Sequence, residues 1–348
     1  MMLTRRDTLP GGFLETPARE LHRLLDGPTL IHLPGRREPE LFVSLLLHGN
    51  EDTGLVALQQ VLRDHAGRMA PRAMSILIGN VSAAREGLRR LDHQPDYNRV
   101  WPGTKQHADT AEHAAMSEVR SIMTGRGMFA SIDIHNNTGL NPHYGVVDRL
   151  DPKSLHLALL FSHTVVWFRG AAGSQTAAFS SLCPSVAVEC GKPGNPASEA
   201  QAARFIDGCL HMAEFPSHGV REHDIDLYHT VATVKVRADV RFGFGDAQAD
   251  LDFDPRLDHM NFRDLEPGTL FAHTRHPAPL EVRNEAGDDV GKEFFSIADG
   301  TLRLARRAMP AMLTLDVRAV RQDCLCYLME RVPFELVQSA NQPLRARA

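Results

Sequence analysis

Long hydrophobic runs are missing from this sequence. The longest strongly apolar stretch, Leu41–Leu47, is interrupted by Ser44 and is far shorter than the roughly 20 residues that a membrane-spanning helix needs. A secretory signal is not expected either, because Pro-Gly-Gly at residues 10–12 stands where its apolar stretch would lie. The sequence therefore favours a cytoplasmic protein without a membrane partner.

An excess of positive charge is also missing. Lysine and arginine together number 38 against 43 aspartate and glutamate residues, which gives a formal net charge of -5. Because nucleic acids and anionic membranes attract basic surfaces, neither is expected as a partner. A small molecule or a short peptide fits this charge better, and association into a homo-oligomer stays open.

Cysteine is scarce and shows no pairing pattern. The chain has five cysteines and no Cys-x-x-Cys pair, so the sequence indicates neither a disulfide framework nor a thiolate zinc site. Cys324 and Cys326 stand in a strand-like run, where two small residues on one face of a strand are a more frequent explanation than a redox site. We expect all the thiols to be reduced.

The length of the chain and its pattern of apolar residues predict two domains. At 348 residues, with 43% apolar residues, the chain exceeds what one core usually spans. Residues 1–222 alternate short apolar runs with helical periodicity, which predicts an α/β domain with a mixed, mostly parallel sheet flanked by helices. Residues 223–348 alternate in the manner of strands, as at 230–236 and 313–320, which predicts a smaller β-rich domain. The expected strands of the larger domain are Leu41–Leu47, Ala73–Gly79, Phe129–Ile134, Thr164–Phe168 and Ser185–Glu189.

Candidate metal ligands follow two of these strands. His48 and Glu51 come directly after the first strand, at the carboxyl end where open α/β sheets bind ligands. This spacing also arises by chance in a chain with 18 histidines. His135 ends another strand and would complete a set of two histidines and one carboxylate, which leaves a position open for water on a catalytic Zn²⁺. Asp133, on the same face of that strand, is expected to accept the ring N–H of one of the two histidines.

Two further motifs carry groups that suit substrate chemistry. Glu189 ends the strand Ser185–Glu189 before a Gly-Pro-Gly loop, where a carboxylate near a metal can move a proton between water and a leaving amine; a structural carboxylate is the alternative. Asn98 and Arg99 lie in Asp-Tyr-Asn-Arg, and an amide beside a guanidinium fork suits a substrate carboxylate. A solvated surface loop is the alternative for this second motif.

Together the motifs resemble a known family. In chain order they are His-Gly-Asn-Glu, Asp-Tyr-Asn-Arg, Asp-Ile-His-Asn and Val-Glu-Cys-Gly. Over residues 40–195 the pattern resembles the succinylglutamate desuccinylase and aspartoacylase family of the zinc carboxypeptidase superfamily, and the β-rich tail resembles the smaller C-terminal domain of such enzymes. The resemblance implies one Zn²⁺ per chain, held by His48, Glu51 and His135, with Glu189 as the catalytic acid and base.

The resemblance also implies a substrate-binding role for Asn98 and Arg99, and an oxyanion role for an arginine upstream of them. The stretch before Asn98 is longer here than the usual spacing, so Arg89 and Arg90 are both candidates. Aspartoacylases place a tyrosine and an arginine before the catalytic glutamate, whereas this chain has Gln175 and Phe179 there. The resemblance therefore does not extend to specificity for N-acetylaspartate.

His143 follows the third motif in Asn-Pro-His-Tyr. We expect it to line the substrate pocket, and a place in a surface loop is the alternative.

The sequence thus predicts a zinc-dependent amidohydrolase that removes an acyl group from an N-acyl amino acid or a similar small amide bearing a carboxylate. Two alternatives remain open at this point: a zinc carboxypeptidase that acts on peptides, and a metal-binding homologue without turnover. A thiol mechanism through Cys190 is a more remote third. The amino acid, the acyl group and the pathway do not follow from the sequence.

Overall fold

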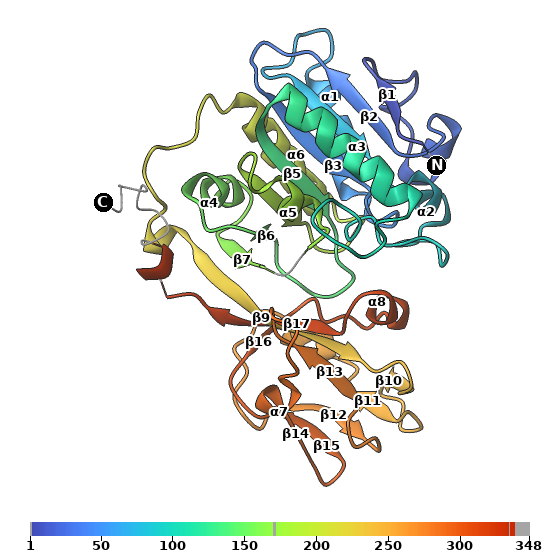
Figure 1. The fold of residues 1–348 in the computed structure, drawn as a ribbon, viewed down its shortest axis with the longest axis vertical. Helices are drawn as coiled ribbons and strands as arrows, with labels where there is room; N and C mark the ends of the chain where they lie inside the picture. Colours follow the sequence, from blue (N-terminus) through green and yellow to red (C-terminus); the bar gives the residue numbers. More distant parts are fainter. Residues whose placement is uncertain (1, 170–171, 334, 338–348) are drawn as a thin grey trace. The chain divides into compact units, whose positions relative to one another are not determined.

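The computed structural model describes residues 2–169, 172–333 and 335–337. The described chain divides into two compact units (Figure 1). The first holds the residues up to Asn136, His143–Leu227 and those after Val332, and the second holds Asn137–Pro142 and Tyr228–Val332. The boundary that we expected from the sequence, at residue 222, lies shortly before Tyr228. Within the described ranges, no helix is both long enough and apolar enough to cross a membrane.

The first unit is built on a mixed, mostly parallel sheet, which confirms the predicted fold class. Its strand order is β1-β2-β4-β3-β5-β8-β6-β7. Only β2 against β4 and β6 against β8 are antiparallel in this series. The strands are β1 (Thr4–Arg6), β2 (Thr29–Leu33), β3 (Glu40–Leu45), β4 (Met74–Ile78), β5 (Met128–His135), β6 (Tyr144–Val147), β7 (Thr164–Trp167) and β8 (Ser185–Glu189).

Helices cover both faces of this sheet (Figure 1). Their starts follow local capping chemistry: the Thr110 side chain accepts the N–H of His113, and the Asn195 side chain accepts the N–H of Ala197, which satisfies amides that have no partner inside the helix. The α-helices are α1 (Thr53–Asp64), α2 (Val81–Glu86), α3 (Ala111–Arg126), α4 (Pro152–Leu159), α5 (Gln175–Phe179) and α6 (Pro196–His211), with 3-10 turns at Ala18–Arg23 and Glu222–Asp224.

Side chains of β3 point alternately to the two faces of the sheet. Phe42 packs in one buried cluster with Met116 of α3 and Phe179 of α5, and its ring lies 5.0 Å from that of Phe179. Leu45 points to the other face, where α1 comes so close that a Cβ on Gly54 would lie 2.8 Å from the Leu45 side chain. Burying side chains of this size contributes about 1.5–3 kcal/mol each, so β3 is fixed from both sides.

The strands that carry the candidate site are neighbours. β3, β5 and β8 run parallel and side by side, with Leu45 opposite Ile134 and His135 opposite Glu189. Because parallel strands end at the same edge of a sheet, the loops that follow all three emerge together. The fold therefore gathers at one edge the segments in which the sequence places its candidate residues.

The second unit is β-rich, as predicted. It contains two sets of strands, one ordered β13-β9-β17-β16 and antiparallel throughout, the other ordered β10-β11-β12-β15-β14. Its elements are β9 (Asp226–Val236), β10 (Phe242–Phe244), β11 (Leu251–Phe253), a 3-10 turn (Leu257–Met260), β12 (Leu270–Thr274), β13 (Leu280–Arg283), α7 (Gly291–Phe294), β14 (Phe295–Ala298), β15 (Thr301–Leu304), β16 (Met309–Ala311), α8 (Val317–Gln322) and β17 (Cys326–Arg331).

One predicted strand of this unit is wrong. Residues 313–320 form a loop followed by the start of α8. The Asp316 side chain accepts the N–H groups of Arg318 and Ala319, and this cap makes a helix the better state for the residues after it.

His32 gives the fold a pH-dependent stability. The residue is buried in β2, with Nδ1 2.6 Å from Ser75 Oγ and no hydrogen-bond partner for Nε2. Burial, and then the charge of Arg126, lower the pKa of His32 below its usual 6.5. The unfolded chain therefore binds the proton more tightly, and the contribution to stability is complete above pH 6.5 and is lost as the pH falls toward the folded pKa.

We expect His32→Gln to reduce the loss of unfolding free energy between about pH 7.5 and about pH 5.5. Urea denaturation at the two pH values measures it, with exposed His223→Gln as the control. Equal losses in both variants and the native chain would rule out this role.

Candidate metal centre

The loop after β3 is built as a tight turn. Leu46 has a φ of +54°, and a Cβ on Gly49 would lie 2.2 Å from the backbone nitrogen of Ala84, so only glycine fits there. The N–H of Glu51 donates to the carbonyl of His48 at 3.2 Å. Because of this turn, the side chains of His48 and Glu51 meet although the two residues are only three positions apart.

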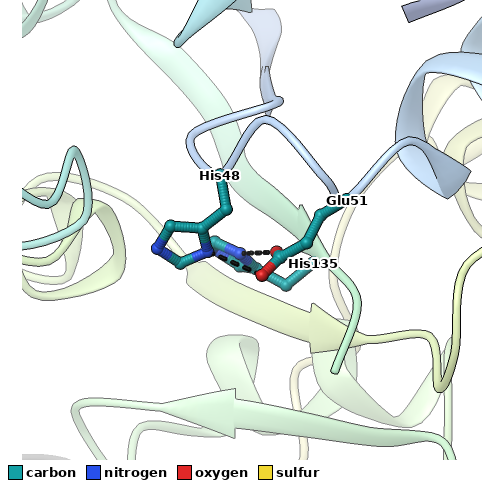
Figure 2. A group of neighbouring side chains, drawn as sticks. All are labelled: His48, Glu51 and His135. Atoms are coloured by element: carbon teal, nitrogen blue, oxygen red, sulfur yellow. Dashed lines mark hydrogen bonds and ion pairs between the residues drawn. The ribbon is translucent and has the colours of Figure 1, made fainter. Parts of the chain in front are cut away.

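Glu51 lies between the two histidines (Figure 2). Its Oε1 is 2.8 Å from Nδ1 of His48, and its Oε2 is 2.8 Å from Nδ1 of His135. All three side chains are buried. One donor atom from each of them lies within 4.8 Å of the others, an arrangement that could hold a metal ion.

The outer nitrogen of each ring faces a second carboxylate. Nε2 of His48 lies 3.0 Å from Asp96 Oδ1, and Nε2 of His135 lies 2.7 Å from Asp133 Oδ2. A carboxylate at Nε2 keeps the proton on that nitrogen and leaves the Nδ1 lone pair for a metal. The residues present therefore fit a Zn²⁺ ion: two Nδ1 atoms and one carboxylate converge, and the carboxylate at each Nε2 favours the tautomer that coordination needs.

The charged side chains of this cluster shift one another's pKa values. Burial raises the pKa of the Glu51 carboxyl, but the two histidines outweigh burial and hold it far below its usual range. Burial likewise opposes ionisation of Asp96, yet His48 and Arg89 keep its pKa well below normal. Burial lowers the pKa of His135, and the carboxylates of Asp133 and Glu51 raise it well above normal in compensation. The carboxylates are thus ionised at neutral pH and present negative charge to a cation.

Of the two candidate arginines, the structure brings Arg89 to the cluster. Its guanidinium lies 3.0 Å from Asp96 Oδ2 and 3.5 Å from Glu51 Oε1, and its backbone carbonyl accepts the N–H of Gly49. Arg90 instead donates to the carbonyl of Gln94 at 2.8 Å. The contact with the tight turn holds the backbone of Arg89 in place beside the histidines.

Asn98 also reaches the cluster. Its Oδ1 accepts the N–H of Gln175 at 2.9 Å, which fixes the orientation of the amide. Its Nδ2 lies 3.1 Å from Nε2 of His135. That ring nitrogen cannot accept a hydrogen bond while it donates to Asp133, so the Asn98 N–H groups remain donors that a substrate oxygen can use. Arg99 donates to the carbonyl of Asn98 at 2.9 Å and is half-buried.

Glu189 ends β8 directly beside His135. The two residues are opposite each other in the ladder, and the N–H of Cys190 donates to the carbonyl of His135 at 2.9 Å. The Glu189 side chain is buried, with 9% of its surface exposed. Burial raises the pKa of the Cys190 thiol, so the thiolate that a cysteine nucleophile needs is suppressed.

The structure also places His143, Gln175, Phe179 and the cysteines, which were named from the sequence. Nε2 of His143 is 2.9 Å from Ser198 Oγ in α6, and its ring packs near Phe161. Gln175 is buried with Nε2 2.5 Å from Ser131 Oγ, and Phe179 is buried in the core. Gln175 and Phe179, which stand where aspartoacylases place a tyrosine and an arginine, therefore support and pack the fold in this chain. All five cysteines are free and buried.

Sequence reasoning missed two residues that organise the cluster. Asp96 was seen only as the first letter of its motif, although it holds His48 and Arg89. Asn136 joins three loops: its N–H donates to Glu51 Oε2 at 3.2 Å, and its side chain contacts Thr53 and the carbonyl of Gly191. A polar residue directly after His135 was the available signal for Asn136, but nothing local marked its partners.

We expect Asp133→Asn to weaken zinc binding by about 10- to 100-fold, because the amide cannot hold the His135 proton as a carboxylate does. A competition titration against a chromophoric chelator measures the affinity, and exposed Asp26→Asn serves as the control. Unchanged affinity in Asp133→Asn would mean that the ring is oriented by other contacts.

The fold and the cluster together define an α/β protein with a candidate two-histidine, one-carboxylate metal centre at the carboxyl edge of its sheet. A sequence model described as the succinylglutamate desuccinylase/aspartoacylase catalytic domain matches residues 38–215. The chain belongs to this family, whose members are deacylases that hydrolyse amide bonds. A search of curated protein sequences gave no significant match.

Solved structures share the fold. The succinylglutamate desuccinylase of Chromobacterium violaceum is 16% identical, with a TM-score of 0.54 over 86% of each chain. A succinylglutamate desuccinylase/aspartoacylase of Rhodobacter sphaeroides is 14% identical, with a TM-score of 0.56 over 86% of this chain and 88% of that one. Murine aminoacylase 3 is 16% identical, with a TM-score of 0.54 over 85% of this chain and 97% of that one.

Proposed function

We propose that this protein is a zinc-dependent amidohydrolase that removes an acyl group from an N-acyl amino acid or a similar small amide bearing a carboxylate. The observation that carries the proposal is the convergence of His48, Glu51 and His135. One possible ligand atom from each lies within 4.8 Å of those of the others. Family membership supports the amide bond as the bond cleaved. The desuccinylase and aminoacylase titles of similar structures support a small acyl amino acid as the substrate class.

In this proposal His48, Glu51 and His135 are the ligands of one Zn²⁺ per chain. A zinc ion bound there would lower the pKa of a coordinated water and polarise the amide carbonyl. Asp96 and Asp133 orient the two rings, so that the ligand geometry is set before substrate arrives. The backbone N–H of Asn136 donates to Oε2 of Glu51, the oxygen that also faces His135.

Glu189 moves the protons. Its strand ends opposite His135, so a carboxylate there can take a proton from the attacking water and give it to the leaving amine nitrogen. Arg89, beside Glu51 and Asp96, is assigned to the oxygen of the scissile carbonyl as negative charge develops on it. Both groups act on the reacting atoms, one as a proton carrier and the other as a fixed donor.

Asn98 and Arg99 orient the substrate through its carboxylate. The Asn98 amide is fixed by Gln175 and keeps its N–H groups for a ligand, and Arg99 supplies a positive charge next to it. Binding the carboxylate in this way holds the amide bond in the orientation that the attacking water needs.

A carboxypeptidase that uses the same groups on a peptide differs in what it accepts. We therefore test the zinc-loaded protein with a panel of N-acyl amino acids, in which the acyl group and the amino acid are varied separately, and with short peptides of matched C-terminal residue. The proposal predicts turnover of at least one N-acyl amino acid and none of the peptides. Cleavage of peptides alone would replace it with the carboxypeptidase, and metal binding without turnover of either class would favour a non-catalytic homologue.

A further inference from the structure

A second group of possible metal ligands lies at the far ends of two helices. His65 is the C-cap of α1, and Asp207 and His211 lie one turn apart at the end of α6. One donor atom from each of the three lies within 4.8 Å of the others. We propose that these residues form a second metal site, which takes a divalent transition-metal cation such as Zn²⁺.

The donor geometry supports this site. Asp207 Oδ1 is 2.8 Å from Nε2 of His65. Nδ1 of His211 lies 3.4 Å from Asp207 Oδ2 and donates to the carbonyl of Asp207 at 3.0 Å, so Nε2 is the nitrogen of His211 whose lone pair can bind a cation. The carboxylate therefore stands between two imidazoles, whose ring centroids are 5.8 Å apart. Positions i and i+4 of a helix face the same way, so Asp207 and His211 offer their donors from one helix while His65 offers a third from its neighbour.

The backbone around the site also favours a cation. Both helices end here, and the unpaired carbonyls of a helix C-terminus carry partial negative charge. Two imidazole nitrogens and a carboxylate oxygen suit zinc, nickel and copper, whereas calcium and magnesium prefer oxygen ligands alone.

This site is separate from the candidate catalytic centre. α1 begins two residues after Glu51, and its 12 residues carry the chain about 18 Å away from it. α6 begins after the loop that follows Glu189, and its 16 residues span about 24 Å. A metal ion at the far end would join the two helices whose starts adjoin the catalytic loops, and would stabilise the folded state because the unfolded chain lacks the site.

Zinc titration of the chelator-treated native protein, in competition with a chromophoric chelator, tests the site. We expect two equivalents to bind. The double variant His65→Ala/His211→Ala should bind one equivalent, and Asp207→Asn should bind the second at least about tenfold more weakly. Exposed His223→Ala is the matched control and should bind both.

A His48→Ala variant separates this proposal from the catalytic one, because it should lose one equivalent and keep the site at the helix ends. Zinc beyond the first equivalent should raise the Tm of the native chain and of His48→Ala, and leave that of the double variant unchanged. A double variant that still binds two equivalents, or a His48→Ala protein that binds none, would overturn the second site. Loss of the catalytic equivalent alone would leave it standing.

Discussion

Glu189→Gln is expected to lower kcat on the N-acyl amino acid substrate by about 100- to 10,000-fold, the usual contribution of a positioned acid and base. Glutamine keeps the shape of the side chain but cannot take the proton of the attacking water. Because the proposed ligands are His48, Glu51 and His135, zinc content should stay at the native value. Steady-state kinetics together with elemental analysis of the same preparation measures both quantities.

The control for this variant is Glu214→Gln, an exposed glutamate of the same unit, which should keep native kcat and native zinc. Loss of zinc together with activity in Glu189→Gln would make Glu189 part of the metal centre. A kcat within a factor of about two of native would remove Glu189 from the proton transfer and require another base.

Arg89→Lys is expected to lower kcat/KM by about 100- to 1000-fold, equivalent to about 3 kcal/mol of transition-state stabilisation. Lysine keeps the positive charge beside Asp96 but loses the planar fork that directs two N–H groups. The charge balance of the metal centre is therefore largely preserved, and the loss reports on the oxygen of the scissile carbonyl. The measurement is kcat/KM at matched zinc occupancy.

Arg90→Lys is the matched comparison, because the two arginines are adjacent and the sequence alone left both as candidates. Arg90 contacts the carbonyl of Gln94, so its replacement should change kcat/KM by less than about tenfold. The reverse pattern, with Arg90→Lys inactive and Arg89→Lys active, would exchange their roles.

The sequence predicted the elements that carry the candidate site because their signals are local. Short apolar runs marked β3, β5 and β8, and chemistry-bearing residues followed each run. Because parallel strands end at one edge of a sheet, these positions in the sequence place His48, Glu51, His135 and Glu189 at that edge. The expected strand Ser185–Glu189 has the same bounds in the structure.

What the sequence did not predict depends on partners far along the chain. Asp96 contacts a histidine 48 positions away, and no periodicity reports such a pairing. The choice between Arg89 and Arg90 was open because both lie in an irregular loop, where neither strand nor helix periodicity orients a side chain. β2, between Pro28 and Pro34, was missed because prolines so close together indicate a loop, whereas pairing with β4 makes it a strand.

Metal content tests the central claim most directly. Each protein is equilibrated with zinc, the excess is removed, and the bound zinc is measured by elemental analysis. All proteins carry His65→Ala and His211→Ala, so that no ion at the helix ends is measured. The protein with these two changes alone, the background protein, is compared with proteins that also carry His48→Ala or His135→Ala. The account predicts about one zinc per chain in that background, lost when either His48 or His135 is also replaced. A folded background protein that retains no zinc, or retention in both further variants, would contradict it.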